Sequence, residues 1–155
     1  LERARLDWPN DLMAGDAKLA GVLVESRGFD AARPHYVVGV GWNVGQRYFP
    51  AELLDEREVT SLALEGVHVS IQTAERALAE SLGSQLDHAL LAPDEVAEDF
   101  GLATGLIGRE VEVDTASQEL IGTLTSLDLE RGIGLQTPDG ERWLALAHVL
   151  AVRES

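Results

Sequence analysis

Residues 8–12 read Trp-Pro-Asn-Asp-Leu, and residues 18–25 read Lys-Leu-Ala-Gly-Val-Leu-Val-Glu. The first stretch predicts a stiff turn, because proline restricts the residue before it and Asn and Asp favour turns. The second is a short apolar run, typical of a strand buried on both faces. Lys18 is the only lysine of the chain, and its compact ammonium suits a single phosphate or carboxylate oxygen. The two stretches together mark the first candidate site.

A second strand is predicted from Tyr36 to Val44, after a loop that ends near Pro34. Gly39 and Gly41 are two residues apart in it, so they share one face of the sheet and leave a slot there. A flat ligand would need such a slot, and so would a helix packed closely on the sheet. The residues alone leave both readings open.

Helices are predicted in the middle of the chain. Pro50 opens a short helical turn, and Ser70 is a plausible N-cap for an amphipathic helix that Pro93 ends. A further helix is expected from Asp94 onward. The long helix is predicted from apolar residues at spacings of three and four: Ile71, Ala74, Leu78, Leu82, Leu86 and Leu90.

From Gly108 onward the apolar pattern changes to a period of two, and Pro138-Asp139-Gly140 is a turn signal. Four or five short strands in this tail predict a small antiparallel barrel. Trp143 is then expected to be an aromatic residue of its core. We place the boundary between the two parts near residues 106–109.

The composition excludes several classes of function. The chain has 155 residues, 27 Asp and Glu against 12 Lys and Arg, and a net charge of -15, which repels nucleic acid and anionic membranes. It has no cysteine, so disulfides, thiolate nucleophiles and cysteine-type zinc sites are ruled out. Its four histidines show no ligand spacing, and we expect no zinc site. No apolar run suits a membrane span, and we expect a cytoplasmic protein.

Three blocks of this sequence resemble the biotin protein ligases, and they occur in the order of that family. They are residues 8–25 as quoted above, Val38-Gly39-Val40-Gly41-Trp42-Asn43-Val44, and Thr60-Ser61-Leu62. The resemblance covers nearly the whole chain. It implies an α/β fold for residues 1–106, a mixed sheet with helices that is the C-terminal part of a class II synthetase-like catalytic domain. It implies an SH3-like antiparallel β-barrel for residues 107–155.

The resemblance also implies an activity with ATP and biotin as substrates and Mg²⁺ as a companion of ATP. Biotin and ATP would form biotinyl-5′-AMP, and a lysine of a carboxylase carrier domain would then take the biotin. By matching positions, Lys18 would contact the biotin carboxylate and the adenylate phosphate. Asp11 would orient and deprotonate the amine, or take part in metal binding. The other implied contacts are Gly21, Leu23, Gly39 and Trp42 for biotin, and Asn10, Asp11, Asn43 and Arg153 for ATP or the adenylate.

The sequence departs from the family at Asp7, where lysine is usual, and at Trp42, where a smaller aliphatic residue is usual. The family's Gly/Arg-rich loop would lie before Leu1, so we do not expect these 155 residues to catalyse the reaction by themselves. One alternative is a non-catalytic relative that binds biotin or a carrier domain. A second is a lipoate-handling relative. An open sheet edge would favour a homodimer, and neither nucleic acid nor a membrane is expected as a partner.

Overall fold

The computed structural model describes residues 4–27 and 35–155. The chain forms two compact units, Leu1–Glu75 and Arg76–Ser155, and each is described by itself. The division falls within a helix, whereas the predicted domain boundary near residue 106 follows the change from helices to strands. That boundary remains a prediction.

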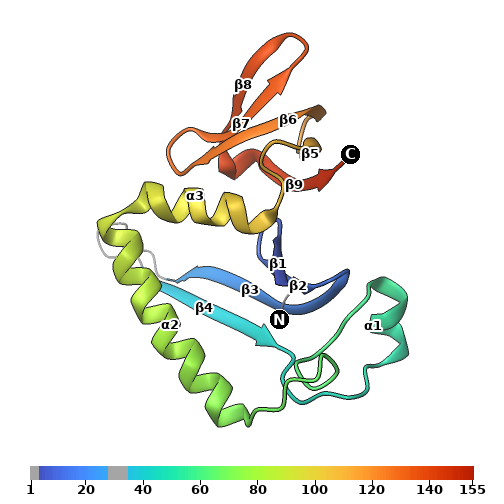
Figure 1. The fold of residues 1–155 in the computed structure, drawn as a ribbon. Coiled ribbons are helices and arrows are strands. Elements are labelled where there is room, and N and C mark those ends of the chain that lie inside the picture. The colour runs from blue at the N-terminus through green and yellow to red at the C-terminus, as the bar shows by residue number, and fades with distance from the viewer. Residues whose placement is uncertain (1–3, 28–34) are drawn as a thin grey trace. The chain divides into compact units, whose positions relative to one another are not determined.

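The first unit is built on a 4-stranded antiparallel sheet with the order β1-β2-β3-β4. Its strands are β1 (Ala4–Asp7), β2 (Asp11–Ala14), β3 (Ala17–Arg27) and β4 (His35–Trp42), which appear blue to cyan in Figure 1. The two predicted strands are confirmed, and β3 is longer than predicted. Gly15 lies in the turn between β2 and β3 with a φ of 63°, a conformation that glycine adopts without steric cost.

A β-bulge in β3 decides which side chains share a face. Leu12 lies opposite Ala20 but Met13 lies opposite Lys18, so Leu19 is an extra residue without a counterpart in β2. In a regular strand Lys18 and Gly21 would lie on opposite faces, because they are three residues apart. The extra residue places them on the same face. Leu19 and Ala20 are both buried, with 1% and 7% of their surface exposed.

The core of the first unit lies at one end of the long β3–β4 hairpin. It consists of Ala14, Leu19, Val44, Leu62 and Ala74, with Leu12, Trp42 and Val67 packed against them. The prediction that residues 19–24 are buried on both faces was wrong beyond Ala20, because Leu23 and Val24 are 61% and 57% exposed. The core cluster ends before these residues, so their side chains face solvent.

The segment after β4 carries the short helix α1 (Ala51–Glu56) and returns to β3. Lys18 N donates to Glu58 O and Thr60 N donates to Lys18 O, both at 2.9 Å, which forms a parallel bridge between Lys18 and Val59. Ser61 is fully buried, and its hydroxyl donates to Gln46 O at 2.5 Å. These bonds hold both ends of the segment, and the predicted helical turn after Pro50 is confirmed.

The two predicted helices are α2 (Ile71–Leu91) and α3 (Pro93–Thr104). Ser70 caps α2 as predicted, since its hydroxyl accepts from Thr73 N at 3.1 Å. Gly105, with a φ of 72°, ends α3 in the left-handed conformation typical of helix C-termini. Among the helices that the structure describes, none is long and apolar enough to cross a membrane.

The second unit contains a 5-stranded antiparallel sheet with the order β8-β7-β6-β5-β9. Its strands are β5 (Glu110–Thr115), β6 (Glu119–Asp128), β7 (Gly132–Thr137), β8 (Gly140–Leu144) and β9 (Val149–Glu154), with a short 3-10 turn at Leu146–His148. The predicted small antiparallel β-domain is confirmed. The described strands pair as an open sheet, since β8 and β9 are its two edges.

Apolar residues of alternate positions fill the core of this sheet. Val111, Val113, Ile133 and Leu135 are at most 1% exposed. Trp143 lies on β8, and the guanidinium of Arg131 stacks 3.6 Å from the centre of its ring. This contact is a cation–π interaction. Trp143 is therefore partly buried beneath an arginine.

Candidate functional site

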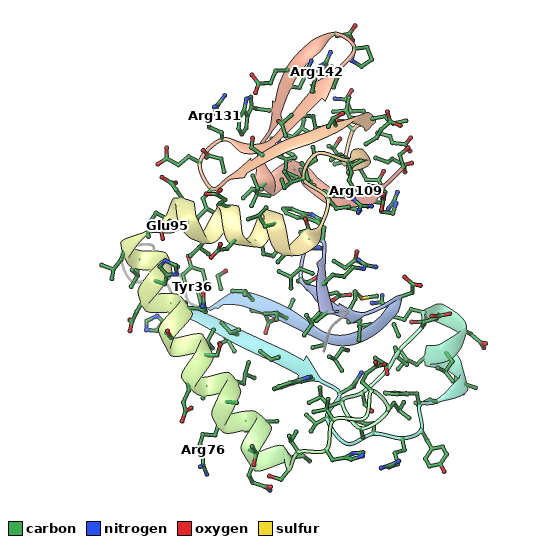
Figure 2. All side chains as sticks on the ribbon, in the orientation of Figure 1. Tyr36, Arg76, Glu95, Arg109, Arg131 and Arg142 are labelled. Carbon is green, nitrogen blue, oxygen red and sulfur yellow. The ribbon has the colours of Figure 1, made fainter. Side chains whose placement is uncertain are left out.

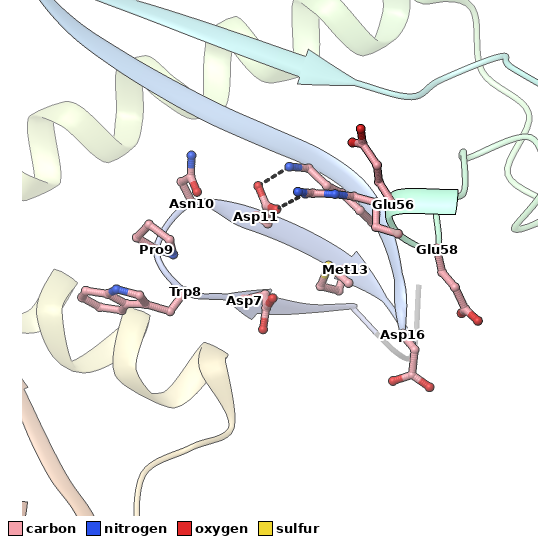
Figure 3. A pocket seen from close by; sticks show the side chains of 11 residues that line it. Asp7, Trp8, Pro9, Asn10, Asp11, Met13, Asp16, Glu56 and Glu58 are labelled. Atoms are coloured by element: carbon pink, nitrogen blue, oxygen red, sulfur yellow. Dashed lines mark hydrogen bonds and ion pairs between the residues drawn. The ribbon is translucent and has the colours of Figure 1, made fainter. Parts of the chain in front are cut away.

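The candidate site centres on the carboxylate of Asp11, which contacts two cations. Lys18 Nζ lies 2.5 Å from Oδ1 of Asp11, and Arg57 NH1 lies 3.2 Å from Oδ2 (Figure 3). The side chains of Asp11, Lys18 and Arg57 are 17%, 26% and 49% exposed. The three residues thus form a partly buried ion cluster with its arginine toward solvent.

Glycine makes room for the contact between Lys18 and Asp11. Gly21 lies opposite Asp11 in the sheet, and a Cβ at Gly21 would lie 2.9 Å from both Asp11 Oδ1 and Lys18 Nζ. Real Cβ atoms essentially never come so close to another heavy atom, so a larger residue would displace the ion pair. The bulge brings Lys18 to this face, and Gly21 leaves the space that both side chains use.

The glycines of β4 extend this open face. Gly41 lies opposite Gly21, and Gly39 lies opposite Leu23, so the predicted shared face is confirmed. A Cβ at Gly39 or Gly41 would have its nearest neighbour at 3.8 or 3.9 Å, a backbone oxygen in each case. Among the described residues, and leaving out the chain neighbours of each glycine, no side-chain atom lies within 4 Å of either Cβ position. The backbone is therefore open at these positions, as the prediction of a slot for a flat ligand requires.

Three depressions of the first unit meet at Lys18. The turn depression, of about 450 Å³, is lined by residues 7–11, Met13, Asp16, Lys18 and residues 56–58. The loop depression, of about 510 Å³, is lined by Lys18, Ala20, Gly41, Trp42, Asn43, Gln46, Leu53, Glu56, Arg57 and Val59. The strand depression, of about 500 Å³, is lined by Asn10, Asp11, Lys18, residues 21–23 and residues 39–41. Such volumes suit small-molecule ligands.

The depressions differ in charge. The turn depression has five carboxylates against two cations, whereas the loop depression has Glu56 against Lys18 and Arg57. Asp7 lies directly opposite Asp11 in the sheet. Arg5 NH1 donates a hydrogen bond to Asp7 Oδ1 at 3.0 Å. The loop depression therefore favours an anionic group, and the turn depression favours an amine.

Comparison with known proteins finds relatives that match the part of the chain that carries this site. A sequence model of the biotin/lipoate A/B protein ligase family matches residues 2–43, which include Asp11, Lys18, Gly21 and both glycines of β4. The bifunctional ligase/repressor BirA of Escherichia coli is 30% identical over 148 residues, or 90% of this chain. The biotin–[acetyl-CoA-carboxylase] ligase of Mycobacterium tuberculosis is 34% identical over 126 residues, or 79% of this chain. This chain is therefore similar to biotin protein ligases over most of its length.

The fold of this chain matches that of solved biotin protein ligase structures. The apo biotin protein ligase of Aquifex aeolicus aligns with a TM-score of 0.76 and 22% identity, over 98% of this chain and 66% of that one. The same enzyme in complex with biotin and ATP aligns equally well, over 62% of its length. This chain spans less than half the length of the curated relatives, 43% of the Escherichia coli protein and 44% of the Mycobacterium tuberculosis protein.

Eight of the residues that the biotin ligase resemblance implicates line these depressions. Asn10 donates its amide to Val22 O at 2.5 Å, which ties the turn to β3. Asn43 lies in the loop depression, and its backbone bonds Leu19 and Leu62. Trp42 also lines that depression, but it pairs with Ala20 and packs on the core. The ligand roles of all eight remain predictions.

Arg153, the ninth implicated residue, lies on β9 of the second unit. Its NH2 group binds Glu112 at 2.8 Å and Asp114 at 2.7 Å, and these bonds raise the pKa of the guanidinium. Glu112, Asp114 and Glu119 could together approach one cation, but Arg153 already neutralises two of them. The structure thus gives Arg153 partners within its own sheet, and its contact with a nucleotide remains a prediction.

Sequence reasoning missed Arg57 and the loop residues around it. Arg57 is 46 residues from Asp11 in the chain, and it follows α1 with an extended backbone. No local pattern relates the two positions. The nearest signal was Thr60-Ser61-Leu62, which is buried and holds the end of this loop against β3.

Proposed function

We propose that this chain provides the biotin and adenylate site of a biotin protein ligase. The reaction is the ATP-dependent formation of biotinyl-5′-AMP and the transfer of biotin to a lysine of a carboxylase carrier domain. In this proposal residues 1–106 are part of the catalytic domain, residues 107–155 are the C-terminal SH3-like domain, and the protein acts in the cytoplasm. The observation that carries the proposal is Lys18, which lies where three depressions meet over a face of glycines.

Lys18 has the chemistry that the first step needs. The step joins a biotin carboxylate oxygen to the α-phosphorus of ATP and releases pyrophosphate, so negative charge gathers on the phosphate oxygens. A fixed ammonium stabilises that charge in a partly buried site. Biotin would lie in the strand depression along Gly21, Gly39 and Leu23, with its carboxylate toward Nζ of Lys18. The nucleotide would occupy the loop depression beside Asn43. Mg²⁺ would enter the site bound to the substrate ATP.

Asp11 has the chemistry that the second step needs. There the carrier's amine attacks the carbonyl carbon of the mixed anhydride, the bond to phosphate breaks, AMP leaves, and the amine loses a proton. Asp11 borders the acidic turn depression, which attracts a protonated lysine. Its carboxylate would orient the amine and accept the proton. Asn10 holds this turn to β3 beside it.

Calorimetry with the 155-residue chain tests the proposal. Biotin is titrated first, and ATP is then titrated in the presence of saturating biotin. We expect the wild type to bind both, and Lys18→Ala to weaken both by about tenfold or more, because it removes a charge-assisted hydrogen bond. Arg76→Ala on α2 also removes one positive charge, but Arg76 lines none of the three depressions, so this variant should bind both ligands as the wild type does.

The outcomes separate the candidate functions. Unaltered binding in Lys18→Ala would remove Lys18 from the mechanism. A chain that binds biotin but does not bind ATP would favour the non-catalytic binding relative. A chain that binds lipoate more tightly than biotin would favour the lipoate-handling relative. A carrier-domain fragment added to the loaded chain tests the partner, and sedimentation tests the expected homodimer.

A further inference from the structure

We propose that Arg57 is a second phosphate-binding side chain of this site, which leaves Asp11 and joins Lys18 on the phosphate oxygens of the nucleotide. The inference rests on the proposed function, and it adds a residue that the sequence pattern did not implicate. In the structure Arg57 NH1 lies 3.2 Å from Asp11 Oδ2.

The backbone places Arg57 at the site. Arg57 N donates to Leu53 O at the end of α1, and the next residue accepts a hydrogen bond from Lys18 N. The parallel bridge between Lys18 and Val59 then fixes the same stretch of chain against β3. Main-chain hydrogen bonds therefore hold the backbone of Arg57 close to that of Lys18, so the proximity of the two cations does not depend on side-chain rotamers alone. Both border the loop depression.

The ion pair between Arg57 and Asp11 is weak enough to exchange. The Arg57 side chain is 49% exposed, and an ion pair with an exposed partner contributes little to stability because water screens it. A guanidinium has five N–H donors in a planar fork that suits phosphate oxygens. In the loop depression it would have a second cation beside it and Glu56 as the opposing charge. A polyphosphate would therefore give the Arg57 guanidinium more hydrogen-bond acceptors and more negative charge than the Asp11 carboxylate does.

The exchange has a consequence for Asp11. Both of its oxygens contact cations in the structure, Oδ1 with Lys18 and Oδ2 with Arg57. A carboxylate held in this way is a poor acceptor for an incoming amine. When Arg57 moves to the phosphate, Oδ2 becomes available on the side of the turn depression. Arrival of the nucleotide would then prepare Asp11 for the second step.

The test compares ATP with adenosine, each titrated into the 155-residue chain with saturating biotin. We expect Arg57→Ala to weaken ATP binding by about tenfold or more and to leave adenosine binding unchanged. Arg57→Lys keeps the charge but loses the fork, so it should fall between the two. Arg76→Ala, whose side chain projects from α2 in Figure 2, is the charge-matched control and should bind ATP as the wild type does.

A second set of variants separates direct contact from charge neutralisation. If Arg57 touches phosphate, Arg57→Ala weakens ATP binding in an Asp11→Asn background as well. If the effect vanishes in that background, Arg57 acts only by neutralising Asp11 and the inference is overturned. Equal loss for ATP and adenosine, or no loss for ATP, also overturns it.

These outcomes are distinct from failure of the proposed function. A chain that binds biotin through Lys18 but does not distinguish ATP from adenosine would overturn the role of Arg57 and leave the biotin site standing. A chain that binds neither biotin nor ATP would overturn both.

Discussion

Lys18 and Asp11 are seven residues apart in the chain, and their side chains meet at 2.5 Å across two strands. The contact forms because a bulge turns Lys18 to the face of Asp11 and because Gly21 carries no side chain beneath them. The pair is partly buried, so each charge depends on the other more than it would at an open surface. A substitution that separates them should therefore affect ligand binding before it affects the fold.

Asp11→Asn should tighten the binding of ATP. The variant keeps the shape of the side chain and removes the negative charge between Lys18 and Arg57, so the site becomes more positive. Calorimetry without added Mg²⁺ should give an affinity several-fold higher at low salt, and the gain should shrink as salt screens it. Weaker binding at every salt concentration would contradict the assignment of the anion to Lys18 and Arg57.

Gly21→Ala and Gly39→Ala should differ in a defined way. At Gly21 the new Cβ meets Lys18 Nζ and Asp11 Oδ1 at 2.9 Å, so it displaces the ends of two side chains. At Gly39 its nearest neighbour is Leu23 O at 3.8 Å, an ordinary contact. Both variants should keep a melting temperature close to that of the wild type, measured by circular dichroism.

Ligand titrations distinguish the two glycine variants. Gly21→Ala should lose affinity for biotin and for ATP, because it displaces Lys18, which contacts both ligands in the proposed function. Gly39→Ala should lose affinity for biotin alone, because it narrows the strand depression. Unchanged biotin binding in Gly39→Ala would mean that biotin does not lie along β4.

Ser61→Ala should lower the free energy of unfolding by about 1–3 kcal/mol. The hydroxyl is fully buried, donates to Gln46 O and accepts from Leu64 N at 3.2 Å, and its loss leaves both groups without this partner. Urea unfolding measures the change. Ser117→Ala, at an exposed position of the second unit, is a matched control and should change stability by less than about 0.5 kcal/mol.

Gly132→Ala should destabilise the second unit more than Gly140→Ala does. Both glycines have a positive φ, 98° and 117°, so each alanine is strained. At Gly132 the new Cβ also collides with the backbone of Leu144, whereas nothing lies within 4 Å of a Cβ at Gly140. We expect a loss of roughly 3 kcal/mol or more at Gly132 and roughly 1 kcal/mol at Gly140. Equal losses of stability at the two positions would show that the strain of the positive φ, and not the collision with Leu144, determines both.

Asp128→Ala should lower the melting temperature at neutral pH and lose this effect in acid. Backbone N–H groups of Arg131 and Glu130 donate to the Asp128 carboxylate at 2.7 and 2.8 Å and lower its pKa from the ordinary 3.8. A lowered pKa contributes stability that is present above 3.8 and is lost as the pH falls through the lower folded value. Melting curves at pH 7 and at pH 2–3 measure it. A difference between variant and wild type that is the same at both pH values would exclude the carboxylate charge as the cause.

Much of the local structure was predictable from the sequence. The turn at residues 8–11, the N-cap at Ser70, the helix ending before Pro93 and the period-two tail were each predicted and are confirmed. The shared face of Gly39 and Gly41 followed from the alternation of a strand, and pairing with Gly21 and Leu23 confirms it. Caps, turns and periods are properties of neighbouring residues, so the sequence carries them directly.

The tertiary structure alone decided the composition of the ion cluster. Strict alternation would have placed Lys18 and Gly21 on opposite faces, and only pairing with β2 reveals that Leu19 is the extra residue. Arg57 reaches Asp11 because a loop closes through Glu58 and Thr60 onto β3 and through Ser61 onto Gln46, which follows β4. A register shift and a loop closure depend on which distant segments pair. That choice minimises the free energy of the whole unit and leaves no mark on a short stretch of sequence.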